Sequence, residues 1–329
     1  MKREDWVLLG KRRIINILRS RLLASEKQLE SKIAESGPTN QLCNPHILSS
    51  ARLLLEEDNK VRHLLDPSGM PFYYHTDVYD PSIAAHAQRK ELLFQLYAKY
   101  RRLVSVPELC GSALEKILWQ AIPSNTFLTI GSQNSPTDQF GQIKLPGRLD
   151  IILISSNGPQ FAALIEAKNI REWIYPTNHL LWKLIEKALA FRLSGHPTVP
   201  VLISRKIQSS TRNFFHKVGI LGLDTHYQYF DESLKDDIVD IQHTDGLGFK
   251  DVRIIEPPLD YVLRFFNKTI LEQGPAYAKQ FDAVSPILER HVSFFADKNV
   301  SFKQRTQRWN ALSQELRISS GYDDYDEEY

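Results

Sequence analysis

Two short apolar runs separated by a turn form the clearest pattern in this chain. The runs are Leu149–Ser155 and Phe161–Lys168, and the five residues between them include Asn, Gly and Pro. Gly and Pro provide the backbone angles of tight turns, so the pattern predicts an antiparallel hairpin. Because every residue from Phe161 to Ile165 is apolar, we expect the second strand to be central and covered on both faces.

Helical and strand-like segments alternate around this hairpin. In chain order, we expect a helix at 107–122, a strand at 127–130, a polar loop up to 145, the hairpin, a helix within 176–193, a strand at 199–204, a helix at 210–218 and strand-like sequence at 221–230. Ser105 and Glu108 predict a capping box at the start of the first helix. Helices that alternate with strands predict an α/β fold with helices on both faces of a sheet.

The segments on either side of this core differ from it in pattern. Residues 1–82 predict a basic first helix, helices near 25–35 and 45–57, and strands at 61–65 and 70–75 around the turn Asp66–Gly69. A helix at 83–103 would lead into the core, which we place at 83–255. Residues 256–318 predict helices at 259–273, at 277–295 and up to 316. The acidic residues 319–329 predict a disordered tail.

Composition limits the class of protein. The 329 residues are 42% apolar and 24% charged, and no apolar run approaches the length of a membrane-spanning helix. The opening residues do not resemble a signal peptide, and two cysteines cannot build a disulfide framework. We therefore expect a cytoplasmic protein with no membrane partner, in which Cys43 and Cys110 are reduced. The net charge is only +2, although residues 1–24 carry an excess of basic residues.

The register expected for the hairpin places three charged residues close together. If the turn centres on Gly158, partners across the hairpin have numbers that sum to about 316. Asp150 therefore faces Glu166. Side chains two apart on a strand share a face, so Lys168 lies beside Glu166. The pattern thus predicts two carboxylates and one lysine at the ends of two adjacent strands.

Two carboxylates held close together repel one another and need a compensating cation. Carboxylate oxygens without nearby thiolates or histidines suit Mg²⁺ or Mn²⁺. Such an ion can polarise a phosphodiester and lower the pKa of a bound water, and Lys168 would orient that water or stabilise charge on the phosphate. The alternative is that Glu166 and Lys168 belong to an ordinary solvated strand face, but the apolar run before Glu166 argues for burial.

These residues resemble a known family. Gly147-Arg148-Leu149-Asp150 and Glu166-Ala167-Lys168 are similar to the paired motifs of the PD-(D/E)xK nucleases, the restriction-endonuclease-like superfamily. The similarity covers residues 105–230, and Leu149 stands where the family name has Pro. It implies a three-layer core with a mixed central sheet, Mg²⁺-dependent cleavage of DNA, and commonly a homodimer.

The resemblance also implies roles for individual residues. Asp150, Glu166 and the carbonyl of Ala167 would hold the metal ion, and Lys168 would activate water. Many members carry a further acid on the first helix, for which Glu115 is the candidate because it lies at the border of the apolar stripe. The alternative is that Glu115 lies on the solvated surface and pairs with a neighbouring lysine.

Basic residues near the hairpin are candidate contacts to DNA. Arg148 and Lys144 precede Asp150 in the chain, and we expect them to bind phosphates. Lys187, on the helix that follows the hairpin, is a further candidate. Residues 1–82 also resemble a winged helix-turn-helix domain, whose second helix would enter a DNA groove. A scaffold or dimerisation role for that region is the alternative.

The sequence thus predicts a metal-dependent DNA endonuclease that acts in restriction, defence, repair or recombination. Two alternatives stay open. One is a DNA-binding regulator built on a nuclease-like core without catalytic activity. The other is a structural or partner-binding subunit in which the acidic residues only stabilise the hairpin.

Overall fold

The computed structural model describes residues 3–35, 43–106, 108–124, 126–130, 137–156 and 160–318. Its contacts divide the chain into two compact units. One contains the described residues up to Leu109 together with Asp231–Ile254, and the other contains Cys110–Phe230 and the described residues from Ile255 onward. The centre of the predicted turn, 157–159, and the tail, 319–329, lie outside the described residues.

A five-stranded mixed sheet forms the centre of the second unit. Its strands are β4 (Phe127–Ile130), β7 (Ile151–Ser155), β8 (Ala162–Lys168), β9 (Thr198–Ser204) and β10 (Leu221–Asp224), in the order β10-β9-β8-β7-β4. The pairs β4–β7 and β7–β8 are antiparallel, and the pairs β8–β9 and β9–β10 are parallel. β8 is therefore the central strand, as its continuous apolar sequence predicted.

The predicted register of the hairpin is confirmed. Ile151 pairs with Ile165, and the other partners across β7 and β8 have numbers with the same sum of 316. The ladder ends at this pair, so Asp150 lies one residue beyond the last paired position of β7. Residues Ala162 to Glu166 are all buried, which agrees with a strand covered on both faces.

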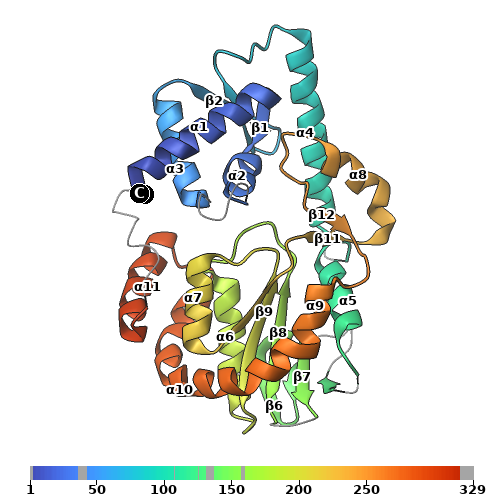
Figure 1. Ribbon diagram of the computed structural model, residues 1–329, viewed down its shortest axis with the longest axis vertical. Coiled ribbons are helices and arrows are strands. Elements are labelled where there is room, and N and C mark those ends of the chain that lie inside the picture. The colour runs from blue at the N-terminus through green and yellow to red at the C-terminus, as the bar shows by residue number, and fades with distance from the viewer. Residues whose placement is uncertain are drawn as a thin grey trace. The chain divides into compact units, whose positions relative to one another are not determined.

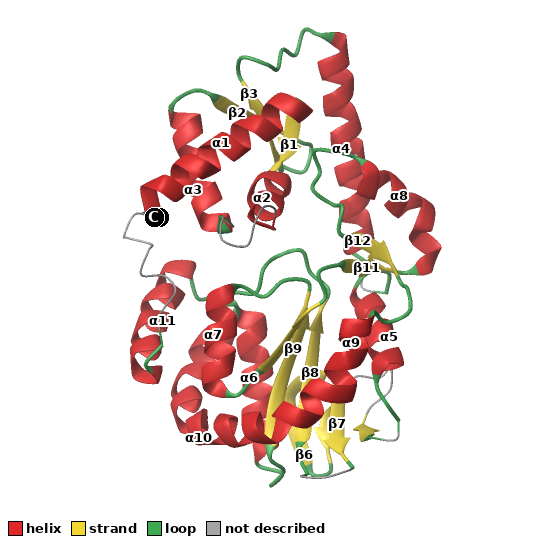
Figure 2. Cartoon of the chain, in the orientation of Figure 1, coloured by secondary structure: helices red, strands yellow, loops and turns green. Residues whose placement is uncertain are grey.

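Helices cover both faces of the sheet (Figure 1). On one face, α5 (Gly111–Ala121) and α9 (Asp260–Arg264) pack on the odd-numbered side chains of β7 and β8. On the other face, α6 (His179–Arg192) and α7 (Ser209–Val218) pack on the even-numbered ones. Figure 2 shows the strands between these two sets of helices. The apolar stripe expected at 107–122 is buried in the first of these cores.

Three expectations for the second unit are wrong in detail. The residues expected as a polar loop include a hairpin of β5 (Thr137–Phe140) and β6 (Ile143–Leu149). The capping box is not formed, because α5 begins only at Gly111, with Cys110 as its N-cap residue. The segment 221–230 is not one strand but two, since β10 is followed by the separate strand β11 (Gln228–Phe230).

The C-terminal part of the chain is helical, as expected. The position predicted for the first interruption between its helices is wrong. A π-helical turn, Phe265–Thr269, links α9 to the single long helix α10 (Ile270–Ala296), and α11 (Phe302–Leu316) follows. The sequence predicted an interruption at Gly274, yet this residue lies inside α10. A Cβ atom at this position would stand 2.5 Å from the ring of Phe161, so Gly274 serves close packing rather than helix termination.

The first unit begins with alternating helices and strands. In chain order these are α1 (Arg3–Arg21), β1 (Leu23–Ser25), a π-helical turn (Gln28–Lys32), α2 (Ile33–Glu35), α3 (Pro45–Glu57), β2 (Val61–Leu65) and β3 (Pro71–His75). The strands form an antiparallel sheet in the order β1-β3-β2. The helix expected near 25–35 is thus only partly correct, because a strand and a π-helical turn occupy its first half.

The remaining elements of the first unit come from two distant segments. The helix α4 (Ala84–Val104), expected to lead into the nuclease-like core, groups by its contacts with the first unit. The segment Asp231–Ile254 supplies a 3₁₀ turn (Glu232–Leu234), α8 (Lys235–His243) and β12 (Val252–Ile254). Cys43 and Cys110 are buried and free. Among the described residues, no helix has both the length and the apolarity needed to cross a membrane.

The end of α7 provides a test of this packing. Gly219 has a left-handed backbone (φ +75°), and a Cβ atom there would stand 2.3 Å from the carbonyl oxygen of Tyr277. We expect Gly219→Ala to lower the free energy of unfolding by about 3 kcal/mol or more, from backbone strain and overlap together. Chemical denaturation would measure this change.

Gly195→Ala is the matched control. Gly195 is also left-handed (φ +81°), but no atom lies within 4 Å of the added Cβ. The free energy of unfolding of this variant should fall by only about 1 kcal/mol, which is the cost of the left-handed backbone for alanine. Equal losses in the two variants would contradict the close approach of α10 to Gly219.

Candidate active site

The predicted acidic residues meet at one edge of the central sheet. Glu166 and Lys168 lie at the carboxyl end of β8, and Asp150 lies directly before β7. Since β7 runs antiparallel to β8, the start of one strand and the end of the other share this edge. Glu166 follows the even-numbered side chains of β8, so it faces α6 rather than α5.

Both carboxylate oxygens of Glu166 are engaged by ammonium groups. Oε1 lies 2.5 Å from Nζ of Lys168, and Oε2 lies 2.7 Å from Nζ of Lys187 on α6. Only 5% of Glu166 and 6% of Lys187 are exposed. A buried carboxylate is costly unless it is paired, and these two lysines together provide the pairing.

Asp150 is fixed by the backbone of the neighbouring strand. Its Oδ2 accepts a hydrogen bond of 2.6 Å from the backbone N–H of Ala167. Burial, with the nearby negative charge of Glu166, raises the pKa of Asp150 to about 6. In an extended strand the N–H and C=O of one residue point to the same side, so the carbonyl of Ala167 lies on the side of Asp150.

Lys168 stays charged despite its burial. Burial alone would lower the pKa of its ammonium group, but Glu166 and Asp150 outweigh that effect, and the pKa is raised. Lys168 is therefore a cation at neutral pH, and it pairs directly with Glu166.

Glu115 joins this cluster from the opposite face of the sheet. It lies in the middle of α5, and burial raises its pKa to about 7, with further contributions from Asp150 and Glu166 and an opposing one from Lys168. A surface carboxylate paired only with a neighbouring lysine would not experience these charges. Glu115 therefore lies near enough to the three charged residues predicted on the strands for their charges to act on its pKa.

Asn169, which the sequence reasoning missed, connects the elements that carry these groups. Its Nδ2 donates hydrogen bonds of 2.6 Å to the carbonyl oxygens of Cys110 and Tyr229, and its Oδ1 accepts one of 2.9 Å from the N–H of Tyr229. Cys110 is the N-cap residue of α5. The residue after Lys168 therefore fixes the start of the helix that carries Glu115. A polar residue directly after a buried strand was the available signal.

The three predicted phosphate contacts lie in different environments. Lys144 and Arg148 are exposed on β6, where alternate side chains point to solvent. Lys187 instead is buried, and besides Glu166 it donates to the backbone carbonyl of Arg148. Gly147 (φ +152°) lies directly against its stem, since an added Cβ would be 3.4 Å from Cε of Lys187. Sequence reasoning missed this internal role because it depends on α6 packing beneath β6.

The donor atoms suit a hard divalent cation. Asp150, Glu166 and the Ala167 carbonyl offer oxygen ligands, and a cation bound there would offset the repulsion between the two carboxylates. Mg²⁺ is commonly held by one or two carboxylates, with water and phosphate oxygens completing its shell. Within the part of the chain that the structure describes, no cluster of three or more His, Cys, Asp or Glu side chains is arranged to hold a metal ion.

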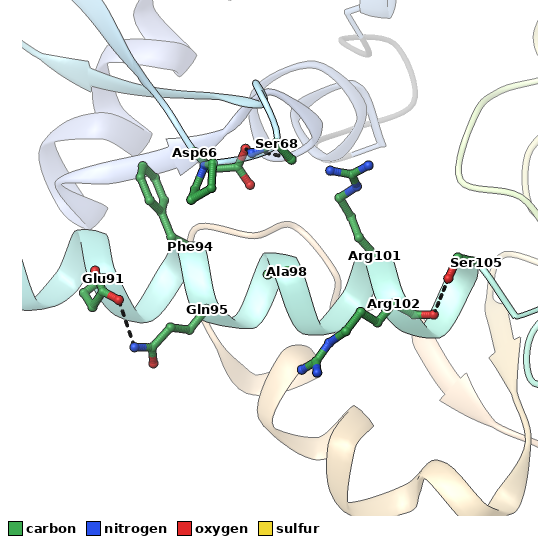
Figure 3. A pocket seen from close by; sticks show the side chains of 10 residues that line it. Asp66, Ser68, Glu91, Phe94, Gln95, Ala98, Arg101, Arg102 and Ser105 are labelled. Atoms are coloured by element: carbon green, nitrogen blue, oxygen red, sulfur yellow. Dashed lines mark hydrogen bonds between the residues drawn. The ribbon is translucent and has the colours of Figure 1, made fainter.

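A pocket of about 510 Å³ lies elsewhere, within the first unit. The turn Asp66–Ser68 forms one wall, and residues of α4 from Glu91 onward, together with its C-cap residue Ser105, form the other (Figure 3). Oδ1 of Asp66 is occupied by the N–H and hydroxyl of Ser68 and by the N–H of Met70. None of the predicted site residues lines this pocket, so the acidic cluster remains the candidate active site.

Comparisons with known proteins provide no information about this site. No protein-family model matches the chain, no curated protein matches its sequence, and no solved structure matches its fold.

The raised pKa of Glu115 predicts a pH-dependent stability. A glutamate in the unfolded chain has a pKa of about 4.3. The folded protein therefore binds the proton of Glu115 more tightly than the unfolded chain does. The resulting stabilisation is complete below about pH 4 and is lost as the pH rises through about 7. We expect Glu115→Gln to match the unsubstituted protein at pH 4.5 and to melt a few degrees higher at pH 8, as measured by thermal unfolding in EDTA.

Glu272→Gln provides the control. Glu272 is exposed and forms only a surface pair with Lys268, which contributes little to stability. Its melting temperature should follow that of the unsubstituted protein throughout the pH range. A constant difference between Glu115→Gln and the unsubstituted protein at every pH would contradict the assigned pKa.

Proposed function

We propose that this protein is a metal-dependent DNA endonuclease with a three-layer, restriction-endonuclease-like core of the PD-(D/E)xK type. The observation that carries the proposal is the meeting of Asp150, Glu166 and Lys168 at the end of the central strand, with Glu115 beside them. The element order α5, β4, β7, β8, α6, β9, with the hairpin of β5 and β6 added between β4 and β7, supports it, since the sequence pattern predicted a helix, three strands, a helix and a strand in this order.

Asp150, Glu166 and the carbonyl of Ala167 would hold Mg²⁺ or Mn²⁺. When bound, such an ion would polarise the phosphodiester and lower the pKa of a water molecule. This is the chemistry that one buried and one partly buried carboxylate beside a lysine are suited to support.

The protein's own groups would then handle protons and charge. The ammonium of Lys168 would donate a hydrogen bond to a non-bridging phosphate oxygen and stabilise the negative charge that develops there. Glu115, with its pKa of about 7, can accept the proton of the attacking water near neutral pH. The water oxygen would form a bond to phosphorus, the bond from phosphorus to the ester oxygen would break, and that oxygen would take a proton from solvent, so that two shorter strands result.

DNA would lie along β6, where Lys144 and Arg148 are exposed beside the acidic cluster. The first unit resembles a winged helix domain in its element order, but its second helix is poorly suited to contact DNA. Arg52, the only Lys or Arg of α3, is buried and paired with Glu30 and Glu56. We therefore assign phosphate binding to β6. A homodimer would provide two sites and so cut both strands.

One observation favours a structural role instead. Both oxygens of Glu166 are paired with lysines, so the cluster is stable without a metal ion. In that case the acidic residues would only hold the hairpin against α6. A regulator that binds DNA without cutting it is the other alternative.

Plasmid nicking distinguishes these functions. We expect Mg²⁺-dependent relaxation of supercoiled DNA that EDTA abolishes, and a loss of at least about 100-fold in rate for Lys168→Ala with DNA binding retained. Lys217→Ala, an exposed lysine on α7, is the control and should cleave normally. Binding without cleavage by the unsubstituted protein would indicate the regulator, and neither activity would indicate the structural subunit.

The assignment of β6 predicts a change in the salt dependence of binding. Each phosphate contact contributes about 0.9 to the slope of log K against log salt. We expect the double variant Lys144→Gln, Arg148→Gln to reduce this slope by about 2 and to weaken binding equally for unrelated sequences, as measured by fluorescence anisotropy.

Lys268→Gln, Lys279→Gln is the matched double control, since it removes two exposed positive charges from α10 and the π-helical turn before it. If both double variants changed the slope equally, binding would reflect net charge rather than a surface on β6.

A further inference from the structure

Lys187 occupies a position that neither surface binding nor ordinary helix packing explains. It extends from the buried face of α6, and its Nζ lies 2.7 Å from Oε2 of Glu166. The same ammonium group donates to the carbonyl of Arg148, two residues before Asp150. It therefore contacts both segments that carry the candidate metal ligands.

Two ammonium groups balance the two strand carboxylates without an ion. Asp150 and Glu166 contribute two negative charges when ionised, and Lys168 and Lys187 contribute two positive ones. Lys168 is required by the proposed chemistry, whereas Lys187 is buried on the side of α6 and cannot reach a substrate while it holds Glu166. One of the two ammonium groups is thus available only for the carboxylate.

We propose that Lys187 is a resident counter-ion of the site that competes with the divalent metal for Glu166. The inference rests on the proposed function, because it concerns the ion that this function requires. The ammonium group repels a divalent cation placed on the same carboxylate, and the repulsion is strong in a site with little water. Lys187 therefore keeps the affinity for the ion low in the absence of DNA.

Substrate would relieve this competition. A phosphodiester brings one negative charge into the cluster, and that charge offsets the positive charge of Lys187 while the ion binds. Metal and DNA therefore bind cooperatively, because each lowers the electrostatic cost of the other. Lys187 is a positioning residue in this scheme, since it acts through Glu166 and not on the substrate.

The test measures ion binding rather than cleavage. Lys187→Gln removes the charge and keeps a polar amide on a side chain that is one atom shorter than lysine. We expect this variant, in the full chain without DNA, to bind Mn²⁺ at least about tenfold more tightly than the unsubstituted protein at pH 7.5, by calorimetry and by electron paramagnetic resonance of free Mn²⁺.

Lys183→Gln is the matched control. Lys183 lies one turn earlier on α6, its side chain is 44% exposed, and it pairs with Glu186 at 2.9 Å. Its removal changes the net charge equally but should change Mn²⁺ affinity by less than about twofold, because the charge is screened by solvent.

Thermal unfolding at increasing Mn²⁺ concentrations provides a second test, which applies even if the variant folds poorly without the ion. A Lys187→Gln protein that folds only when Mn²⁺ is added would also support the inference, since the ion would then replace the missing counter-ion. A variant that stays unfolded at every Mn²⁺ concentration, or that binds Mn²⁺ no more tightly than the unsubstituted protein, would overturn it.

The two proposals can fail separately. If the unsubstituted protein nicks DNA with Mg²⁺ but Lys187→Gln shows unchanged Mn²⁺ affinity, only the counter-ion role is wrong. If neither protein binds Mn²⁺ and no cleavage occurs, the proposed nuclease function is wrong as well.

Discussion

The burial of an ionised carboxylate at the end of β8 is the constraint on which the second unit depends. Glu166 is 5% exposed, and removing one partner of such a buried pair typically costs about 3–5 kcal/mol. Its two lysines come from different elements, Lys168 from the same strand and Lys187 from α6. The need to satisfy one side chain therefore fixes the distance of α6 from the strand and, through the Arg148 carbonyl, the path of β6.

Much of the core could be predicted from the sequence because its signals are local. The register of β7 and β8 follows from the symmetry of a hairpin about its turn, and β4, α6, β9 and α7 follow from short apolar runs or helical periodicity. The meeting of Asp150, Glu166 and Lys168 was a direct consequence of that register. Glu115 was harder, because only the packing of α5 decides whether its carboxylate faces solvent or the sheet.

The features that escaped prediction depend on contacts between distant segments. β5 and β6 are polar on the side that faces solvent, and their pairing with each other and the packing of Phe140 on Phe191 of α6 explain why they are ordered as strands. The role of Lys187 requires knowing that α6 crosses under Gly147. Asn169 satisfies backbone groups of residues 59 and 60 positions away, and no short sequence window contains that information.

The two faces of β8 also bear on how this chain can vary among related proteins. Odd-numbered side chains enter the core beneath α5, and even-numbered ones face α6. One residue inserted between Ile165 and Glu166 would turn the carboxylate toward α5 and leave the inserted side chain, in place of the carboxylate, facing Lys187. Changes of length should therefore accumulate in the connections between strands, while β8 keeps the same number of residues from its first buried alanine to its lysine.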